Sequence, residues 1–160
     1  MSTRVEARPT VRRFPTLGIL STGDDAVATL SRLTLALVIF PHGAQKVLGW
    51  FGGYGFAGTM QFFTEQMGIP AVLAFAAIAV EFLGPLALVL GLGARLAAAG
   101  IVVNMAVAAW MVHLPNGFFM NWFGNQKGEG FEYHLLAIAL ALVVVIRGSG
   151  AWSLDRRLSR

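Results

Sequence analysis

The sequence predicts an all-α membrane protein, an antiparallel bundle of four transmembrane helices. Of its 160 residues, 56% are hydrophobic and 12% are charged, and the mean hydropathy is +0.68. This composition is too apolar for an ordinary soluble domain of that length. The apolar residues also gather in stretches near the ~20 residues that a helix needs to cross a bilayer. We expect one membrane domain over residues 26–147, with cytoplasmic tails at residues 1–25 and 148–160.

Composition also excludes several classes of protein. The chain contains no cysteine, which rules out disulfides, thiolate nucleophiles and cysteine-bound metal ions. The net charge of +4 could attract nucleic acid, but the basic residues form no stripe interleaved with aromatic residues, so we expect no nucleic-acid partner. Residues 1–25 hold no apolar core followed by a small-residue cleavage site, so we expect no signal peptide.

The first predicted span, residues 26–48, carries a polar face toward its end. Arg32 lies near its beginning, where we expect the side chain to snorkel to the membrane surface. Pro41 interrupts the helical hydrogen bonds. Three polar residues at positions i, i+3 and i+4 follow it on one helix face: His42, Gln45 and Lys46. This face has two interpretations, a polar cap that meets lipid headgroups or one wall of a ligand site.

The second predicted span, residues 70–92, places a carboxyl group near the middle of the membrane. A charged carboxylate at the centre of a span costs about 2.5 kcal/mol or more unless a partner relieves it. We therefore expect Glu81 to face the inside of the bundle, either neutral or paired with Lys46 or His42, directly or through a water molecule.

The third and fourth predicted spans, residues 94–114 and 131–147, add further polar groups. Small residues surround Asn104 at helical spacing, a pattern typical of close helix packing in lipid. Asn104 has two interpretations, a hydrogen bond between helices or a contact to a ligand. His113 lies near the outer end of the third span, where a histidine that faces the membrane surface is the simpler interpretation. The fourth span begins with Glu132, Tyr133 and His134.

The distribution of charge predicts the orientation. If both termini are cytoplasmic, all ten arginines lie on the cytoplasmic side and both lysines lie outside, as the positive-inside rule requires. The polar ends of all four spans then lie in the outer half of the membrane, above an almost wholly apolar inner half. We expect them to line a pocket covered by two aromatic connections, residues 49–68 and 115–130. The alternative is that these groups face headgroups around the rim of the bundle.

Three stretches, residues 37–59, 81–98 and 132–155, resemble the DoxX family of small bacterial membrane proteins. The order of their glycines and polar residues carries the likeness, which extends over residues 31–155. The resemblance implies a four-helix protein of the bacterial inner membrane. It also implies a place beside redox or stress systems, because the family takes its name from a subunit of a thiosulfate:quinone oxidoreductase.

On this basis we expect an inner-membrane subunit of a redox system that binds a quinone. A quinone needs an apolar slot, one or two hydrogen-bond donors and a path for protons, and its electrons would come from a soluble partner protein. The alternative is a non-enzymatic membrane scaffold, or a carrier of a small molecule or metal ion. We expect no covalent cofactor and no metal site, because paired histidine spacing is absent. The candidate ligand-binding residues are His42, Gln45, Lys46, Glu81, Asn104, His113, Glu132 and His134.

The topology can be tested in the natural cysteine-free background. Single cysteines at positions 57 and 126 should react with an impermeant thiol reagent added outside intact cells, because both positions lie in outer connections. Cysteines at positions 3 and 158 should react only after the membrane is opened. Labelling of position 3 or 158 from outside would show that the predicted orientation is wrong.

Overall fold

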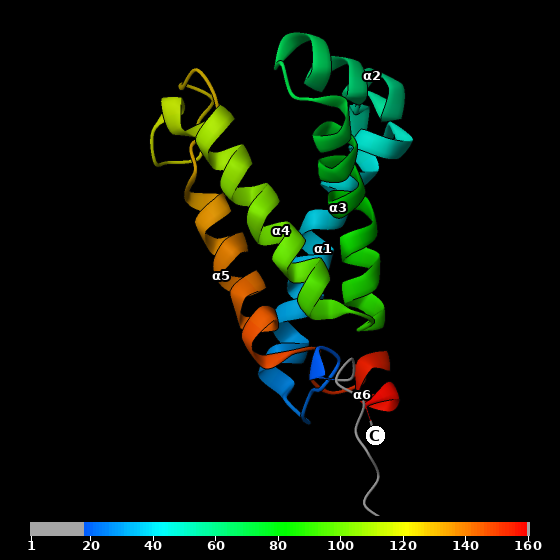
Figure 1. Cartoon of the computed structure of the whole chain (residues 1–160). Coiled ribbons are helices and arrows are strands. Elements are labelled where there is room, and N and C mark those ends of the chain that lie inside the picture. The colour runs from blue at the N-terminus through cyan, green and yellow to red at the C-terminus, as the bar shows by residue number, and fades with distance from the viewer. Residues whose placement is uncertain (1–17, 160) are drawn as a thin grey trace, which may run out of the picture.

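The computed structural model describes residues 18–159, so residues 1–17 of the predicted amino-terminal tail lie outside the described part. Within residues 18–159 the chain forms six α-helices and no strand (Figure 1). The helices are α1 (Ala26–Leu48), α2 (Gly55–Gln61), α3 (Ala71–Leu90), α4 (Ala94–Ala108), α5 (Glu132–Arg147) and α6 (Leu154–Leu158). Short 3-10 or π turns join them: η2 (Trp50–Gly52), η3 (Phe62–Gln66), η4 (Ala109–His113) and η5 (Leu114–Asn116).

Three helical stretches are long and apolar enough to cross a membrane: Ala26–Leu48, Ala71–Leu90 and Ala94–Asn116. These confirm three of the four predicted spans, with ends within two residues of the predicted ones. The remaining helix, α5, has 16 residues and is about 24 Å long at 1.5 Å per residue. That length is short for an untilted span, so the fourth crossing remains a proposal.

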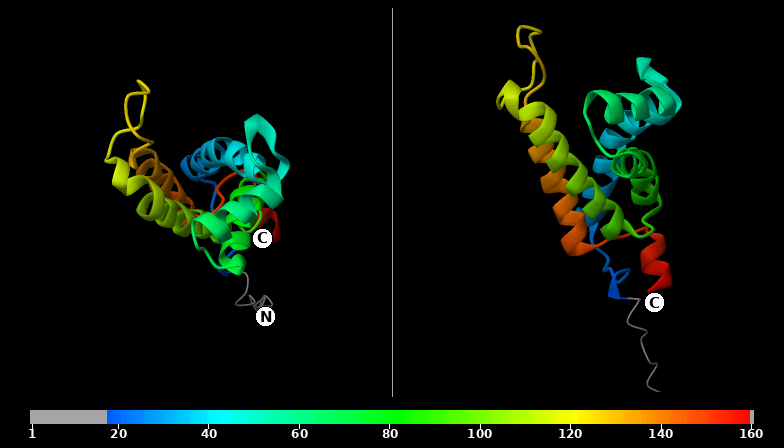
Figure 2. Two further views of the ribbon diagram at one scale, coloured as in Figure 1. Left: turned by 90° about the horizontal axis from the view of Figure 1, so that it is seen from above. Right: turned by 45° about the horizontal axis from the view of Figure 1, so that its top comes forward.

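Four long helices pack as two pairs. Helix α1 packs mainly against α3, and α4 packs mainly against α5, while α3 also contacts α4 and α1 contacts α5. Figures 1 and 2 show the pairs joined at one end and splayed at the other. We call the joined end, residues 18–25, 91–93 and 148–159, the basal end, and residues 49–70 and 109–131 the far end.

The core fills the space between the pairs. Leu35, Ile39, Leu88, Ile101 and Val144 each expose 1% or less of their surface. Large apolar side chains such as Leu37 (76% exposed) and Val72 (79% exposed) cover the outside. An exposed apolar surface on long helices is what a lipid environment requires, because lipid tails replace water around the protein.

Helices α1 and α3 approach closely at Gly43. A Cβ atom at this position would collide with the backbone of Glu81 and Phe82. Only glycine therefore permits this crossing, in the manner of small residues between membrane helices. The crossing brings the polar end of α1 to the middle of α3.

The position of the Arg32 side chain differs from the one predicted from the sequence. Its side chain does not snorkel to the surface but is 1% exposed at the base of the core. The guanidinium donates to the main-chain carbonyls of Leu88, Val89, Ser149, Ala151 and Trp152, at 2.5–3.1 Å. Carbonyls in the last turn of a helix lack helical donors, and a guanidinium carries five N–H groups in a fixed fork. This match makes burial of the charge more favourable than exposure.

Asp155 completes the basal end from the predicted carboxy-terminal tail. It is 1% exposed and accepts the N–H groups of Gly93 at 2.7 Å and Ala94 at 3.1 Å, where α4 begins. The hydroxyl of Ser149 also donates to it. A carboxylate at this position satisfies the unpaired N–H groups at the helix start and interacts favourably with its dipole. Residues 148–159 thus pack onto the membrane helices.

Asp25 joins the beginning of α1 to the end of α5. Its carboxylate accepts the N–H groups of Val27 and Ala28, and it lies 2.8 Å from the Arg147 guanidinium. The N–H of Ala28, followed by Arg147, lowers the pKa of Asp25 from its ordinary value. The contribution of this link to stability is therefore present above the ordinary carboxyl pKa and is lost as the pH falls through the lowered one.

Replacement of Arg32 tests its structural role. Arg32→Met should lower the free energy of unfolding in detergent by about 3 kcal/mol or more, because it leaves the buried Ser149 carbonyl and the part-buried Val89 and Trp152 carbonyls without their donor. Arg147→Gln is the control, because its ion pair with Asp25 is half-exposed and should contribute about 1 kcal/mol or less. Equal unfolding free energies for the two variants would contradict this role of Arg32.

Candidate functional site

Glu81 lies at the meeting point of α1, α3 and α4. It is 6% exposed. The Lys46 ammonium on α1 lies 2.5 Å from one carboxylate oxygen, and the Asn104 amide on α4 donates to the other at 2.9 Å. We call Lys46, Glu81 and Asn104 the carboxylate triad. It confirms the predicted pairing of Glu81 with Lys46 and shows Asn104 as a hydrogen-bond donor between helices.

Local sequence explains how the triad forms. Lys46 lies in the last turn of α1, one turn beyond Gly43, whose lack of a side chain lets α1 approach the Glu81 backbone. In α3, Pro85 stands four residues after Glu81 and cannot donate to its carbonyl. Asn104 also lies 3.4 Å from the carbonyl of Ala77, one turn before Glu81. The side chain of Glu81 is thus bonded to α1 and α4, and α1 packs closely against its main chain at Gly43.

The three histidines of the chain gather beside Tyr133. The ring centroids of His113 and His134 are 4.1 Å apart, those of Tyr133 and His134 are 5.3 Å apart, and those of His42 and Tyr133 are 5.9 Å apart. We call His42, His113, Tyr133 and His134 the histidine cluster. Its members come from α1, η4 and α5. His113 therefore contacts another candidate residue.

Two polar atoms of the histidine cluster are buried without a hydrogen-bond partner among the described residues. They are the hydroxyl oxygen of Tyr133 and Nδ1 of His134. Leaving such a group unpaired costs about 1–3 kcal/mol, and native proteins rarely do so without a structural or functional reason. These atoms can bind a polar group of a ligand or a water molecule. Tyr133 was missed as a candidate, although its position between Glu132 and His134 at a span entrance was a usable signal.

Two predicted residues join neither group. Glu132 accepts the N–H of Met120 at 2.9 Å and the indole N–H of Trp122 at 3.2 Å, so it organises the connection that precedes α5. Gln45 is half-buried, and its side chain makes no hydrogen bond to another described residue. The structure thus divides the candidates into two neighbouring groups and these two outliers.

The two aromatic connections, residues 49–68 and 115–130, do not form the single cover that the sequence predicted over one pocket. The connection with η2, α2 and η3 lies over α1 and α3, whereas residues 115–130 lie over α4 and α5 (Figures 1 and 2). Because the helix pairs splay, the connections stand apart. Within residues 18–159, no group of three histidine or carboxylate side chains is arranged to hold a metal ion.

Comparisons of the sequence with known proteins identify one family of membrane proteins. The sequence model of the DoxX family matches residues 27–114. Inner membrane protein YqjF of Escherichia coli is 30% identical over 86% of this chain and 95% of its own length. Uncharacterized membrane protein Rv3486 of Mycobacterium tuberculosis is 33% identical over 81% of this chain and 79% of its own length.

A third relative carries a biochemical name. Putative oxidoreductase CatD of Bacillus subtilis is 29% identical over 79% of this chain and 82% of its own length. No solved structure matches the chain.

A double-mutant cycle tests the carboxylate triad. Glu81→Leu should lower the free energy of unfolding in detergent by about 3–5 kcal/mol, because the Lys46 charge loses its buried partner. Lys46→Met should lower the free energy of unfolding by a similar amount, because the Glu81 carboxylate then loses its partner. The double variant should recover most of this loss, since two apolar side chains replace the pair.

The matched control is Glu65→Gln. Glu65 is exposed and bonds only to Gln61 four residues earlier, so its replacement should change stability by about 0.5 kcal/mol or less. Additive losses in the double variant would refute direct coupling between Lys46 and Glu81.

Proposed function

The chain belongs to the DoxX family, and from this premise we propose that it is a multi-pass inner-membrane subunit of a redox system that binds a quinone. The binding groups are Tyr133 and His134 of the histidine cluster, with the carboxylate triad beside them. The electrons come from a soluble redox partner. Each part of this proposal rests on a different property of the described residues.

The proposed topology has four spans and two cytoplasmic termini. Helix α5 runs beside α4 and ends at Arg147, which shares the basal end with Arg95 and Arg156. Arg95 donates to the carbonyls of Val145 and Ile146, which ties the beginning of α4 to the end of α5. Two helices in this contact, with their cations at one end, support a fourth crossing oriented by the positive-inside rule.

The two unpartnered buried atoms carry the proposal for a quinone. A quinone is a flat apolar ring with two carbonyl oxygens, and each oxygen accepts hydrogen bonds. The Tyr133 hydroxyl and an N–H at Nδ1 of His134 can donate to such an oxygen. The neighbouring rings of His42 and His113 offer faces against which a flat ring can pack.

The carboxylate triad supplies a means of proton exchange. Reduction of a quinone to a quinol consumes two electrons and two protons. The Lys46 side chain is 24% exposed, whereas that of Glu81 is 8% exposed, so Lys46 forms the accessible side of the pair. A paired ammonium and carboxylate can pass a proton between solvent and a bound ring with little movement.

A non-enzymatic scaffold is the second candidate. Both oxygens of Glu81 are already occupied, by Lys46 and by Asn104. A carboxylate bonded in this way connects three helices whether or not a ligand binds. The name of the Bacillus relative supports the redox proposal, while the inner-membrane and membrane-protein names of the others fit both candidates.

Binding of a short-chain quinone tests the proposal. Protein in neutral detergent should bind the quinone, and quenching of its tryptophan fluorescence can follow the titration. Tyr133→Phe should weaken binding about three- to tenfold, because it removes one hydrogen bond to a carbonyl. Tyr54→Phe is the matched control, since the only other tyrosine is 76% exposed at the far end. Failure of the unmodified protein to bind quinone would favour the scaffold.

A further inference from the structure

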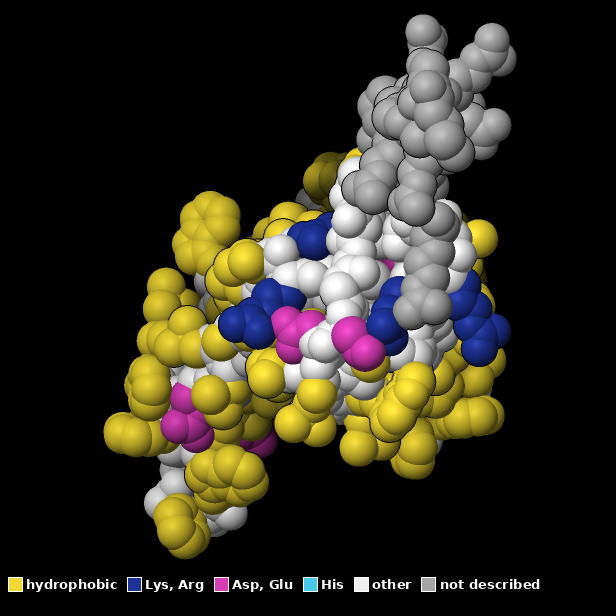
Figure 3. Space-filling model, turned by 90° about the horizontal axis from the view of Figure 1, so that it is seen from below, with side chains coloured by type: hydrophobic (Ala, Val, Ile, Leu, Met, Phe, Trp, Pro, Cys, Tyr) yellow, Lys and Arg dark blue, Asp and Glu magenta, His cyan; other side chains and the backbone are white. Residues whose placement is uncertain are grey.

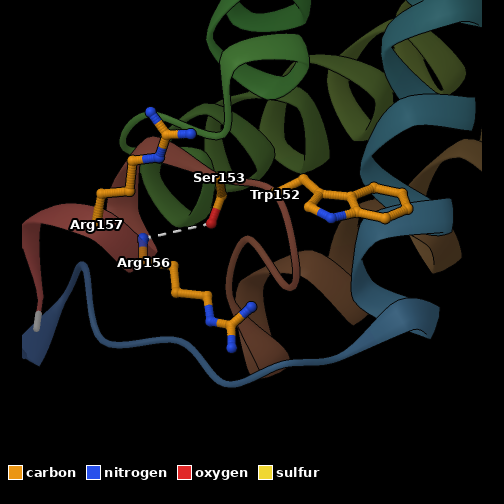
Figure 4. A pocket seen from close by; sticks show the side chains of 4 residues that line it. All are labelled: Trp152, Ser153, Arg156 and Arg157. Carbon is orange, nitrogen blue, oxygen red and sulfur yellow. Dashed lines mark hydrogen bonds between the residues drawn. The ribbon is translucent and has the colours of Figure 1, made fainter.

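The basal end contains a pocket that neither the carboxylate triad nor the histidine cluster uses. It has a volume of about 120 Å³ and is lined by Trp152, Ser153, Arg156 and Arg157. Figure 4 shows that these side chains come from one short stretch of chain at the beginning of α6. Two cationic side chains and an indole ring are chemistry suited to a phosphate group attached to an apolar molecule.

The chain around this pocket is held in place by buried charges. The Arg32 guanidinium donates to the carbonyls of Ala151 and Trp152 at 3.1 and 2.9 Å. Asp155 is fixed at the beginning of α4. Between these anchors Trp152 adopts φ +49°, a left-handed conformation that is uncommon for residues other than glycine. The pocket is therefore formed by a fixed turn before any ligand arrives.

The lining residues differ in whether their side chains already make hydrogen bonds or ion pairs within the protein. The Ser153 hydroxyl donates to the Gly150 carbonyl at 2.9 Å, and Arg156 lies 2.8 Å from Asp24. Arg157 is exposed and has no carboxylate partner among residues 18–159. Figure 4 shows the Arg157 and Trp152 side chains extending to opposite sides of the lining. Arg157 is thus the cation available to a ligand.

The surroundings place this pocket at the boundary between apolar and charged surface. Trp152 is 87% exposed, and nearby helix ends expose Leu90, Leu92 and Leu158 by 54%, 42% and 56%. Figure 3 shows charged side chains across the basal face and hydrophobic side chains around its rim. Tryptophan favours this boundary in membrane proteins because its ring is apolar and its N–H is polar.

We propose that the pocket binds the phosphate of an anionic phospholipid headgroup. Arg157 provides the counter-charge, Arg156 adds a second cation that it shares with Asp24, and the Trp152 indole lies against the glycerol and upper acyl region. The occupant is a lipid rather than a free anion because the pocket opens beside exposed apolar helix ends. A basic side chain near a membrane surface attracts anionic lipid.

Native mass spectrometry in neutral detergent can measure this binding. The protein should bind phosphatidylglycerol more tightly than phosphatidylcholine. Arg157→Gln should weaken phosphatidylglycerol binding about fivefold, the effect of one cation near an anionic lipid. It should weaken phosphatidylcholine binding less, because the choline cation of that headgroup already offsets the charge of its phosphate. The midpoint of thermal unfolding without lipid should not move, because the Arg157 side chain is exposed.

Lys127→Gln is the matched control, because it removes one exposed cation from the far end. It should retain the affinity of the unmodified protein for phosphatidylglycerol. Equal affinities for the two lipids, or an equal loss in both variants, would overturn the proposal. Complete competition by millimolar inorganic phosphate would also overturn it, because the pocket would then be a site for free phosphate.

Discussion

The structure depends on one carboxyl group buried inside an apolar helix bundle. Glu81 is satisfied by a lysine from α1 and an amide from α4, and neither partner alone would use both of its oxygens. Since an unpaired charge in a membrane is strongly unfavourable, these contacts define how α1, α3 and α4 lie at this level. The glycine at position 43 then becomes necessary, because only a residue without a side chain lets α1 come close enough.

At the basal end, two further buried charges are also satisfied by polar partners. Arg32 is surrounded by main-chain carbonyls and Asp155 by main-chain N–H groups. Asp155 thus accepts N–H groups at the start of α4 that would otherwise remain unpaired, and Arg32 connects the end of α3 to the turn at residues 149–152. This arrangement closes the bundle at one end, while the helix pairs diverge at the other. Tyr133 and His134 lie near the beginning of α5, toward the diverging end, and each has a buried polar atom without a hydrogen-bond partner among the described residues.

Much of this arrangement was predictable from sequence, for physical reasons. The lengths of the apolar stretches correctly predicted three helices long and apolar enough to cross a membrane. The cost of a buried carboxylate predicted that Glu81 would be neutral or paired with Lys46 or His42, and the structure shows the pair with Lys46. The environment of Arg32 was predicted wrongly, because sequence shows that an arginine lies near a helix end but not which carbonyls lie within reach. Asp155 was missed because its partners stand 61 and 62 residues away. The convergence of three histidines likewise depends on the angle between helix pairs, which local patterns do not encode.

The central claim is that Glu81 is an ionised carboxylate paired with Lys46 inside the membrane domain. Infrared spectroscopy of the protein in lipid, compared with Glu81→Gln, measures this directly. At neutral pH the difference spectrum should contain the carboxylate stretching bands of Glu81 and no band from a protonated carboxyl group. A protonated carboxyl band that disappears in Glu81→Gln would contradict the ion pair and the arrangement of helices that depends on it.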